Sequence, residues 1–472
     1  MLPVNCGSHA DYQNLVVENL RKYYPNPDLL ARSTWDIIER FWHLDLSDTD
    51  TLLTHKYSKF GPAPRTPSCM QRSYLLSIDF KVSSITEWAA QLKMNPLFAI
   101  LSGFQVGDTP GVGTFYDFMK RLWDSDDPHM TSHIHPLKAK VKKPDAKGEK
   151  AASVEKVTVA ELLPQLEKTA FPLNDQPYAS LFKIYQKEFL DVSVEKGLIH
   201  KDSLALAGDG TPVVTSHRER KKRICKCKEN GINDCSCDRY FSQPDCDIGW
   251  DSSRDCFYHG YDLYMLVDSQ SDLPVFPHYS YASKHDSHGF LQAFFRMRAF
   301  LPDYKVSKVL LDSAHDAMPY YQYFKRQNIT PFIDLNGKGG RPPVYKNDFT
   351  IDKDGVPVCP SGHRMRRDGI EVAKGRMKFK CPKISHTGGC ISCTCDKPCS
   401  KAKYGRTVHL ILNDNPRLFN NPPRSSKEWK LEYNARTSAE RSNKREKLDF
   451  KLEDSRHRST KMWYCRLYHI LM

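Results

Sequence analysis

Four side chains near the C-terminal end of the chain have the types and the spacing of a site that handles phosphate. Tyr433, Arg436, Glu440 and Lys447 lie in the segment 427–450, which has neither Pro nor Gly and predicts one helix. At about 100° per residue, the four side chains fall within about 60° of one another on one helix face. A carboxylate flanked by two cations and a phenol suits a metal-dependent enzyme that acts on phosphate esters. The alternative is a solvated helix with intrahelical charge pairs.

Two aspartates further upstream could complete such a site, because each belongs to an apolar, strand-like run. Asp209 lies in 203-SLALAGDGTPV-213, where the run ends in Gly-Asp-Gly, and Asp312 ends the run 306-VSKVLLD-312. Around them the order is three strands, helix, strand, helix, strand, which predicts an α/β fold with a mixed sheet that binds ligands at strand ends. Strand-end Asp residues also commonly cap turns. The competing acids of this region are Asp202, Asp262, Asp268 and Asp316.

Three carboxylates brought together would repel one another, and divalent cations would remove that repulsion. Mg²⁺ (or Mn²⁺) prefers oxygen ligands and keeps several waters, so that a few carboxylates suffice to hold it. Two such ions about 4 Å apart can activate a water or a 3′-hydroxyl and stabilise the leaving oxygen. The three acids that we expect to share the ions are Asp209, Asp312 and Glu440.

The pattern Tyr-x2-Arg-x3-Glu-x6-Lys resembles the signature of bacterial insertion-sequence transposases of the DDE class. The pattern is met in full by Tyr433, Arg436, Glu440 and Lys447. Gly-Asp-Gly at 208–210 and Leu-Leu-Asp-Ser at 310–313 look like the first and second aspartates of that family. The resemblance covers residues 200–450, and residues 69–124 look like the helical domain that precedes the catalytic core in related elements.

The resemblance implies an RNase H-like core, Mg²⁺ dependence and cut-and-paste transfer of a DNA element. It implies that Asp209, Asp312 and Glu440 hold the metal ions. It also implies that Tyr433, Arg436 and Lys447 bind phosphates near the cleaved DNA end, which agrees with the use of Arg and Lys as phosphate ligands. Trp429 lies on the same predicted helix face, where it could stack on an unpaired base or pack the helix onto the core.

Two groups of cysteines separate this chain from the plainest members of that family. Since no export signal is visible, the fifteen cysteines are expected to be reduced, and thiolates this close in sequence predict structural Zn²⁺. Unligated thiols or a redox-labile cluster are the alternatives, and the spacing does not fix which four side chains ligate. The candidates in the first group are Cys225, Cys227, Cys235 and Cys237, with Cys246 and Cys256 beyond them. The candidates in the second group are Cys359, Cys381, Cys390, Cys393, Cys395 and Cys399, with His363 nearby.

Composition points to a polyanionic partner. The 472 residues carry 70 Lys and Arg against 56 Asp and Glu, a net charge of +14, and 364–380 alone has seven cations against two acids. The resemblance implies that this partner is double-stranded DNA, both terminal inverted repeats and target, bound by a homodimer. The 40% hydrophobic content excludes a largely disordered chain. With no apolar run of about 18 residues, we expect no membrane span. The resemblance implies a bacterial cytoplasmic, nucleoid-associated protein.

The predicted fold class is α/β: an RNase H-like mixed sheet flanked by helices, preceded by an all-helical domain and interrupted by a cysteine-rich insertion. Residues 1–130 form the helical domain, which could bind DNA through a helix-turn-helix or be an ordinary bundle, and 131–157 form a charged linker. Residues 158–336 form the first part of the core with a cysteine-rich insertion at 217–256. Residues 337–426 form a basic, cysteine-rich insertion, and 427–472 form the catalytic helix and tail.

These features together predict a DNA transposase that cleaves the ends of an element and joins them to target DNA. Two other functions remain open from the sequence. One is a non-catalytic, zinc-stabilised DNA-binding protein derived from a transposase, although such a protein would not need all three acids. The other is an RNase H-fold nuclease that cleaves DNA but never joins strands.

Overall fold

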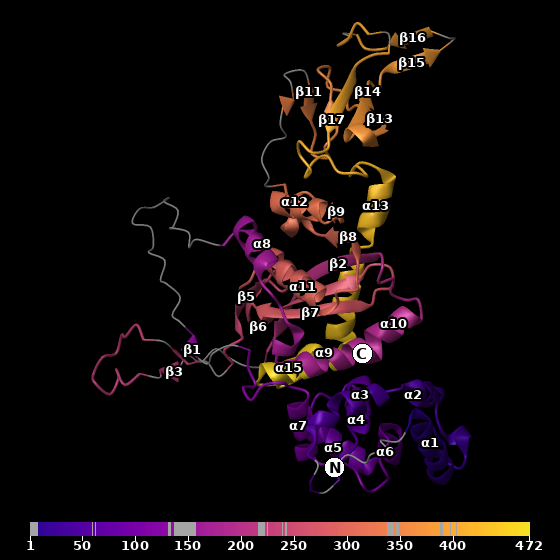
Figure 1. The fold of residues 1–472 in the computed structure, drawn as a ribbon, viewed down its shortest axis with the longest axis vertical. Coiled ribbons are helices and arrows are strands. Elements are labelled where there is room, and N and C mark those ends of the chain that lie inside the picture. Colours follow the sequence, from indigo (N-terminus) through magenta and orange to yellow (C-terminus); the bar gives the residue numbers. More distant parts are fainter. Residues whose placement is uncertain are drawn as a thin grey trace.

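The structure is a computed structural model that describes residues 8–472 apart from 59, 62, 131–133, 136–156, 216–221, 224, 238, 241–242, 338–343, 346–348, 388–389, 397 and 403. Along its long axis, Figure 1 shows the N-terminal helices at one end, a sheet with helices in the middle and a group of short strands at the other end. Most of the predicted linker 131–157 and of the basic run 217–223 lies outside the described residues.

Helices fill the N-terminal part of the chain, as the spacing of its apolar residues predicts. Several begin at clear local signals: Ser8 and Ser84 accept hydrogen bonds from the first turns of their helices, and Pro67 and Pro96 occupy first helical positions. The helices are α1 (His9–Tyr23), α2 (Arg32–His43), α3 (Ser47–Leu53), α4 (Pro67–Asp79), α5 (Ile85–Met94), α6 (Pro96–Ser102) and α7 (Val112–Arg121).

The end of the chain packs on these N-terminal helices. The last helix, α15 (Thr460–Leu471), contacts α4 and α7, and Gln71 donates a hydrogen bond to the sulfur of Met472. Tyr74 of α4 and His469 of α15 meet edge to face with ring centroids 4.7 Å apart. One hydrophobic core therefore runs from the N-terminal helices through α15 to the sheet.

The central layer is a mixed sheet with strand order β5-β6-β2-β8-β9, in which β7 also pairs with β6. Strands β5, β6, β7 and β2 pair antiparallel, whereas β2, β8 and β9 run parallel and are joined by crossover helices. The predicted α/β fold with a mixed sheet flanked by helices is confirmed. The strands are β2 (Leu204–Val214), β5 (Asp247–Asp251), β6 (Cys256–Asp268), β7 (Pro274–Tyr281), β8 (Val306–Leu311) and β9 (Thr330–Ile333).

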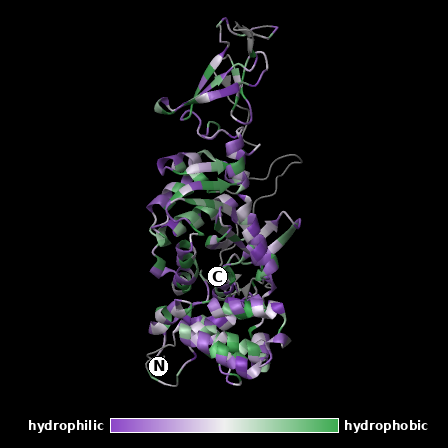
Figure 2. Ribbon diagram, turned by 90° about the vertical axis from the view of Figure 1, so that its right-hand side faces the viewer, coloured by the Kyte–Doolittle hydropathy of each residue, from purple (hydrophilic) through white to green (hydrophobic). Residues whose placement is uncertain are grey.

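Helices cover both faces of this sheet. Helix α11 (Asp286–Phe300) packs on β6, β7 and β2, and α12 (Met318–Arg326) packs beside β9. The helix α14 (Thr437–Lys444) contacts β2 and β6, and α13 (Lys427–Asn434) contacts β9. Figure 2 shows hydrophobic strands inside this layer and hydrophilic residues on many of the surrounding helices. The remaining helices before β2 are α8 (Val159–Lys168), α9 (Ala179–Tyr185), the π-helix η4 (Gln186–Asp191) and α10 (Val192–Glu195).

The inserted segment between β9 and α13 forms small sheets around a second hydrophobic core, which includes Phe349, Met377 and Leu410. A partly buried ion pair attaches it to the central layer, because Arg417 Nη2 lies 2.5 Å from Asp316 Oδ2. Its strands are β10 (Val344–Tyr345), β11 (Phe349–Ile351), β12 (Pro357–Val358), β13 (Arg366–Glu371), β14 (Arg376–Lys380), β15 (Ile384–Thr387), β16 (Cys390–Cys393) and β17 (Thr407–Ile411).

A further small sheet consists of the two-residue strands β1 (Ile134–His135), β3 (Lys222–Arg223) and β4 (Arg239–Tyr240). Between β3 and β4 the chain turns through the first cysteine group. No helix within the described residues has the length and apolar character needed to span a membrane.

Candidate active site

Adjacent parallel strands bring Asp209 and Asp312 side by side. Ala207 of β2 pairs with Leu310 of β8, so two residues further along each strand Asp209 and Asp312 reach the same level. Neighbouring strands lie about 4.8 Å apart, which places the two carboxyl groups next to each other. Residues 103 positions apart in the sequence are thereby neighbours.

Helix α14 lies over the same place and carries Glu440. Asn443, one turn beyond Glu440, donates a hydrogen bond from Nδ2 to Asp209 Oδ2 at 3.2 Å. Arg436, one turn before Glu440, donates from Nη2 to Glu440 Oε1 at 2.6 Å. About half of the Glu440 side chain is exposed to solvent, at 51%. The structure therefore brings Asp209, Asp312 and Glu440 together, with an arginine beside them.

The charges of these acids influence one another. The pKa of Asp209 is raised to about 7, chiefly by burial, with Arg436 lowering it and Asp286, Asp312 and Glu440 contributing to the rise. Burial also raises the pKa of Asp312, but hydrogen bonds from His315 and the Ala314 amide outweigh it, so its net pKa lies below the ordinary value. A buried acid that repels several others is stabilised by a nearby cation.

The donor set fits Mg²⁺ in kind, because carboxylate oxygens are the ligands that this ion prefers. The oxygens are not gathered around one point, however. Within the described parts of the chain, no group of three acids places its oxygens all within 4.8 Å of one another. The carboxylates would have to turn inward to share an ion, and the half-exposed Glu440 has the most freedom to do so.

The prediction that Asp209 ends a strand is wrong, because β2 continues through Gly-Asp-Gly to Val214. The two glycines serve close packing rather than a turn. A Cβ atom on Gly208 would lie 2.7 Å from the Tyr264 hydroxyl, and one on Gly210 would lie 2.7 Å from Asp286 Oδ1. Since side chains alternate along a strand, Gly208 and Gly210 face α11 while Asp209 faces α14.

The competing acids are engaged elsewhere. Asp202 is exposed and pairs with Lys305 at 3.4 Å, and Asp268 accepts hydrogen bonds from Ser271 in a turn. Asp316 is fully buried and pairs with Arg417. Asp262 lies on the α11 face with Asp286, where burial raises the pKa of both carboxyl groups and Asp286 raises that of Asp262 further. Asp209, Asp312 and Glu440 lie on the α14 face.

The predicted single helix over 427–450 is interrupted rather than uniform. Helix α13 ends at Asn434, α14 begins at Thr437, and the π-helix η7 (Arg445–Asp449) follows directly. The wider π-turn changes the rotation per residue, so the angle assumed for Lys447 does not hold. Lys447 donates to the Pro212 carbonyl at 2.7 Å and pairs with Glu453 at 3.2 Å. Lys447 therefore joins η7 to β2 and does not lie beside Glu440.

Tyr433 and Trp429 form a stacked pair at the start of this helical segment. Their ring centroids are 4.6 Å apart with the planes inclined by 16°. Trp429 is 5% exposed and also meets Phe332 of β9, so it packs the helix onto the core, one of its two predicted roles. Tyr433 is half-buried beneath the Arg436 guanidinium, and burial raises the pKa of its phenol to about 12. Its hydroxyl is therefore a donor at neutral pH.

Four cysteines of the first group form a tight cluster that could hold a metal ion. The sulfur atoms of Cys225, Cys227, Cys235 and Cys237 all lie within 4.8 Å of one another. Cys225 and Cys235 are 3.5 Å apart and Cys227 and Cys237 3.6 Å apart, close to the spacing of thiolates around one tetrahedral Zn²⁺. Hydrogen bonds from the neighbouring thiols raise the pKa of Cys227 to about 12, so bound metal would have to displace protons.

The second cysteine group is looser within the described residues. Cys359 and Cys381 are buried in the core of the insertion. Burial raises the pKa of Cys399, and the proximity of those two thiols raises it further. Cys395 is half-buried. The side chains of Cys390 and Cys393 lie outside what the structure describes.

The basic run 364–380 is largely compensated within the protein. Lys378 and Lys380 both pair with Asp368, and Arg376 and Lys374 pair with Glu371. Arg364 pairs with two aspartates of the preceding turn, and Arg367 lies 3.7 Å from Glu428. The run is therefore less available to a polyanion than its composition predicts.

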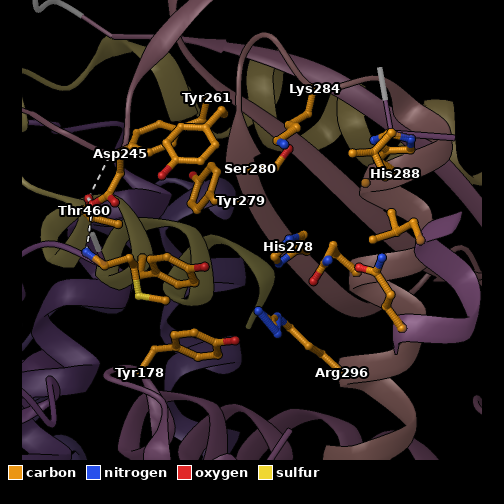
Figure 3. A pocket seen from close by; sticks show the side chains of 18 residues that line it. Tyr178, Asp245, Tyr261, His278, Tyr279, Ser280, Lys284, His288, Arg296 and Thr460 are labelled. Carbon is orange, nitrogen blue, oxygen red and sulfur yellow. Dashed lines mark hydrogen bonds between the residues drawn. The ribbon is translucent and has the colours of Figure 1, made fainter. Parts of the chain in front are cut away.

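A cavity of about 460 Å³ lies apart from the acids, beside β7, α11 and α15 (Figure 3). Tyrosines line much of it, and His278 and Arg296 point into it. None of Asp209, Asp312 and Glu440 lines it, so it is not part of the candidate active site.

Sequence reasoning missed four residues around the acids: Asn443, His315, Tyr264 and Asp286. Asn443 could have been found from its place three residues after Glu440, on the same helix face. His315 likewise lies three residues after Asp312, whereas Tyr264 and Asp286 are brought to the site by packing that spacing does not reveal. A comparison with protein-family models finds no match to this chain, and a comparison with curated proteins finds none either.

Proposed function

We propose that the chain is a DNA transposase of the DDE class with an RNase H-like core. The observation that carries the proposal is the meeting of Asp209, Asp312 and Glu440 on the α14 face of the sheet. The acids come from two adjacent parallel strands and one covering helix, and Asn443 joins that helix to Asp209. The Tyr-Arg-Glu-Lys pattern on the same helical segment adds support from the sequence.

Asp209, Asp312 and Glu440 would hold Mg²⁺ or Mn²⁺. When bound, these ions would supply Lewis-acid activation of the attacking oxygen and charge stabilisation of the leaving oxygen. The three acids place their carboxyl groups on the same face of the sheet, where a cation would offset their repulsion. Asn443 fixes the orientation of Asp209, and Arg436 holds Glu440 at the open side of the site.

The reaction is a pair of phosphoryl transfers. In the first, a water oxygen bonds to phosphorus and the P–O3′ bond breaks, which leaves a 3′-hydroxyl on the element and a 5′-phosphate on the flank. In the second, that 3′-hydroxyl attacks a phosphodiester of target DNA, and a target 3′-oxygen leaves with a proton.

Arg436 and Tyr433 would bind the phosphates near the cleaved end. Arg436 offers guanidinium donors beside the acids, and the protonated Tyr433 hydroxyl offers one more. Lys447 would have to leave Glu453 before it could bind a phosphate. DNA bound here by a homodimer, in the cytoplasm of a bacterium, is part of the same proposal.

Zinc would be structural in this protein. Cys225, Cys227, Cys235 and Cys237 would bind one Zn²⁺ in the turn between β3 and β4. Cys359, Cys381 and Cys399 would contribute to a second site in the insertion. Such sites fold short segments that are too small to build their own core.

Nicking of DNA that carries the inverted repeats flanking the reading frame tests the proposal. The full chain should nick this DNA with Mg²⁺ and not with EDTA, and Glu440→Ala should abolish nicking while DNA affinity stays within about twofold. Glu428→Ala, an exposed acid of α13, is the matched control and should nick normally. Nicking without strand transfer would favour a nuclease, and DNA binding without Mg²⁺-dependent nicking would favour a non-catalytic binding protein.

A further inference from the structure

A chain of hydrogen bonds connects the candidate metal site with the opposite face of the sheet. Asp312 Oδ1 accepts a hydrogen bond from His315 Nδ1 at 2.6 Å, and His315 Nε2 lies 2.9 Å from the Tyr264 hydroxyl. Tyr264 belongs to β6 and lies on the α11 face, where it packs against Gly208. The short helix Ser313–His315 makes the first link possible, because residues three apart overlie each other in a 3₁₀ turn.

Each hydrogen bond in this series donates toward Asp312. Burial raises the pKa of Tyr264 well above its ordinary value, and the nearby carboxylates of Asp209 and Asp286 raise it further. The tyrosine therefore keeps its proton and donates to His315 Nε2. With Nε2 accepting from Tyr264, the imidazole carries a proton on Nδ1 and donates it to Asp312.

Packing holds the two rings in place. His315 is 1% exposed and meets the rings of Phe290 and Tyr320 at centroid distances of 5.7 Å and 6.1 Å. Tyr264 fits only because Gly208 and Gly289 lack side chains, since a Cβ on either glycine would lie within 3.0 Å of a Tyr264 atom. The glycine before Asp209 thus makes room for the tyrosine that supports His315.

We infer that His315, supported by Tyr264, is a positioning residue that orients Asp312 for metal binding. The inference rests on the proposed function. Oδ1 of Asp312 accepts from both His315 and the Ala314 amide, and within the described structure no hydrogen bond or ion pair engages Oδ2. The pair of hydrogen bonds fixes the carboxylate plane and leaves Oδ2 for a metal ion. Groups that orient ligands in this way strengthen metal binding.

Mn²⁺ binding by the zinc-loaded full chain, followed by electron paramagnetic resonance, tests the inference without relying on activity. His315→Ala should weaken Mn²⁺ binding by about 10-fold or more, which is the usual cost of losing such a partner. His315→Asn should restore most of the affinity, because its amide can still donate to Asp312. Tyr264→Phe keeps the ring and removes only the hydroxyl, so it should weaken binding by about threefold, less than His315→Ala.

Two reference variants separate positioning from general damage. His469→Asn alters another buried histidine, in α15, and should lower the melting temperature without changing Mn²⁺ affinity. Asp209→Asn should remove the binding itself. Wild-type affinity in both His315→Ala and Tyr264→Phe would overturn the positioning role alone. Wild-type protein that binds no more Mn²⁺ than Asp209→Asn would overturn the metal site and with it the inference. If His315→Ala does not fold, Tyr264→Phe decides.

Discussion

The four thiols at 225–237 and the three acids on the α14 face are both candidate metal sites, yet they are built in opposite ways. The thiols come from thirteen consecutive residues and have their sulfur atoms within 4.8 Å of one another. The acids come from β2, the end of β8 and α14, and they meet without closing around one point. One site is local and tight, and the other is assembled across the sheet and open.

This difference matches two kinds of metal chemistry. A structural zinc site is closed, with all four ligands supplied by protein, whereas a catalytic site leaves positions free for water and substrate. The carboxylates of the open site must be held in place by neighbouring residues. Asn443 holds Asp209 and His315 holds Asp312 through hydrogen bonds. The thiol site needs no such support from other elements, because the turn 225–237 carries all four of its cysteines. The two sites should therefore fail in different ways when they are broken.

The largest effect is expected at Asp209. Asp209→Asn removes one charge from the open site, so Mg²⁺-dependent nicking should fall by about 10³-fold or more, equivalent to about 4 kcal/mol of transition-state stabilisation. Because the variant also relieves repulsion in a buried site, its melting temperature without metal should not fall. Asp202→Asn, an exposed acid before the same strand, is the control. Nicking by Asp209→Asn at the control rate would contradict the assignment.

A smaller and local effect is expected at the thiols. Cys227→Ser should reduce the zinc content by about one ion per chain, because a tetrahedral site loses one of its four ligands. Protease should then cut within 225–237, while the main thermal transition moves little, since this turn lies outside the shared core. Cys256→Ser, an exposed cysteine outside the cluster, should keep its zinc. Equal zinc in the two variants, measured by mass spectrometry, would show that the cluster does not bind it.

An effect on the pH dependence of stability is expected at Glu446, in the π-helix η7 that directly follows α14. Burial raises the pKa of Glu446 to about 8, although Ser442, Arg445 and Lys447 lower it. The folded protein therefore keeps a proton that the unfolded chain releases near pH 4.5. The resulting stability is complete below that pH and is lost as the pH rises toward 8.

Glu446→Gln should remove this dependence. Without metal, the wild-type melting temperature should fall between pH 5 and pH 8 more steeply than that of Glu446→Gln, by an amount that corresponds to a few kcal/mol, about 1.4 kcal/mol per pH unit. Cys227→Ser should keep the wild-type slope, because the thiol turn is remote from this helix. Parallel pH profiles for wild type and Glu446→Gln, followed by circular dichroism, would contradict the buried proton.

Much of the scaffold could be predicted from the sequence, because apolar spacing reports directly on buried faces. The strands around Asp209 and Asp312 and the helix around Glu440 were placed by such patterns. The glycines beside Asp209 led to the wrong prediction that the strand ends there, since a glycine required for packing looks the same in sequence as one required for a turn. The prediction that Lys447 shares a helix face with Glu440 was wrong because a π-turn changes the angle per residue. Tyr264 was missed because its contact with His315, 51 residues away, leaves no local signal.

Anomalous diffraction from crystals of the full chain with Mn²⁺ added tests the central claim most directly. Data recorded at the manganese and zinc absorption edges distinguish the two metals at the two sites. The expected result is manganese within about 2.2 Å of oxygens from both Asp209 and Asp312, and zinc among Cys225, Cys227, Cys235 and Cys237. Crystals with zinc at the thiols and no manganese at the acids would contradict a catalytic metal site on the α14 face.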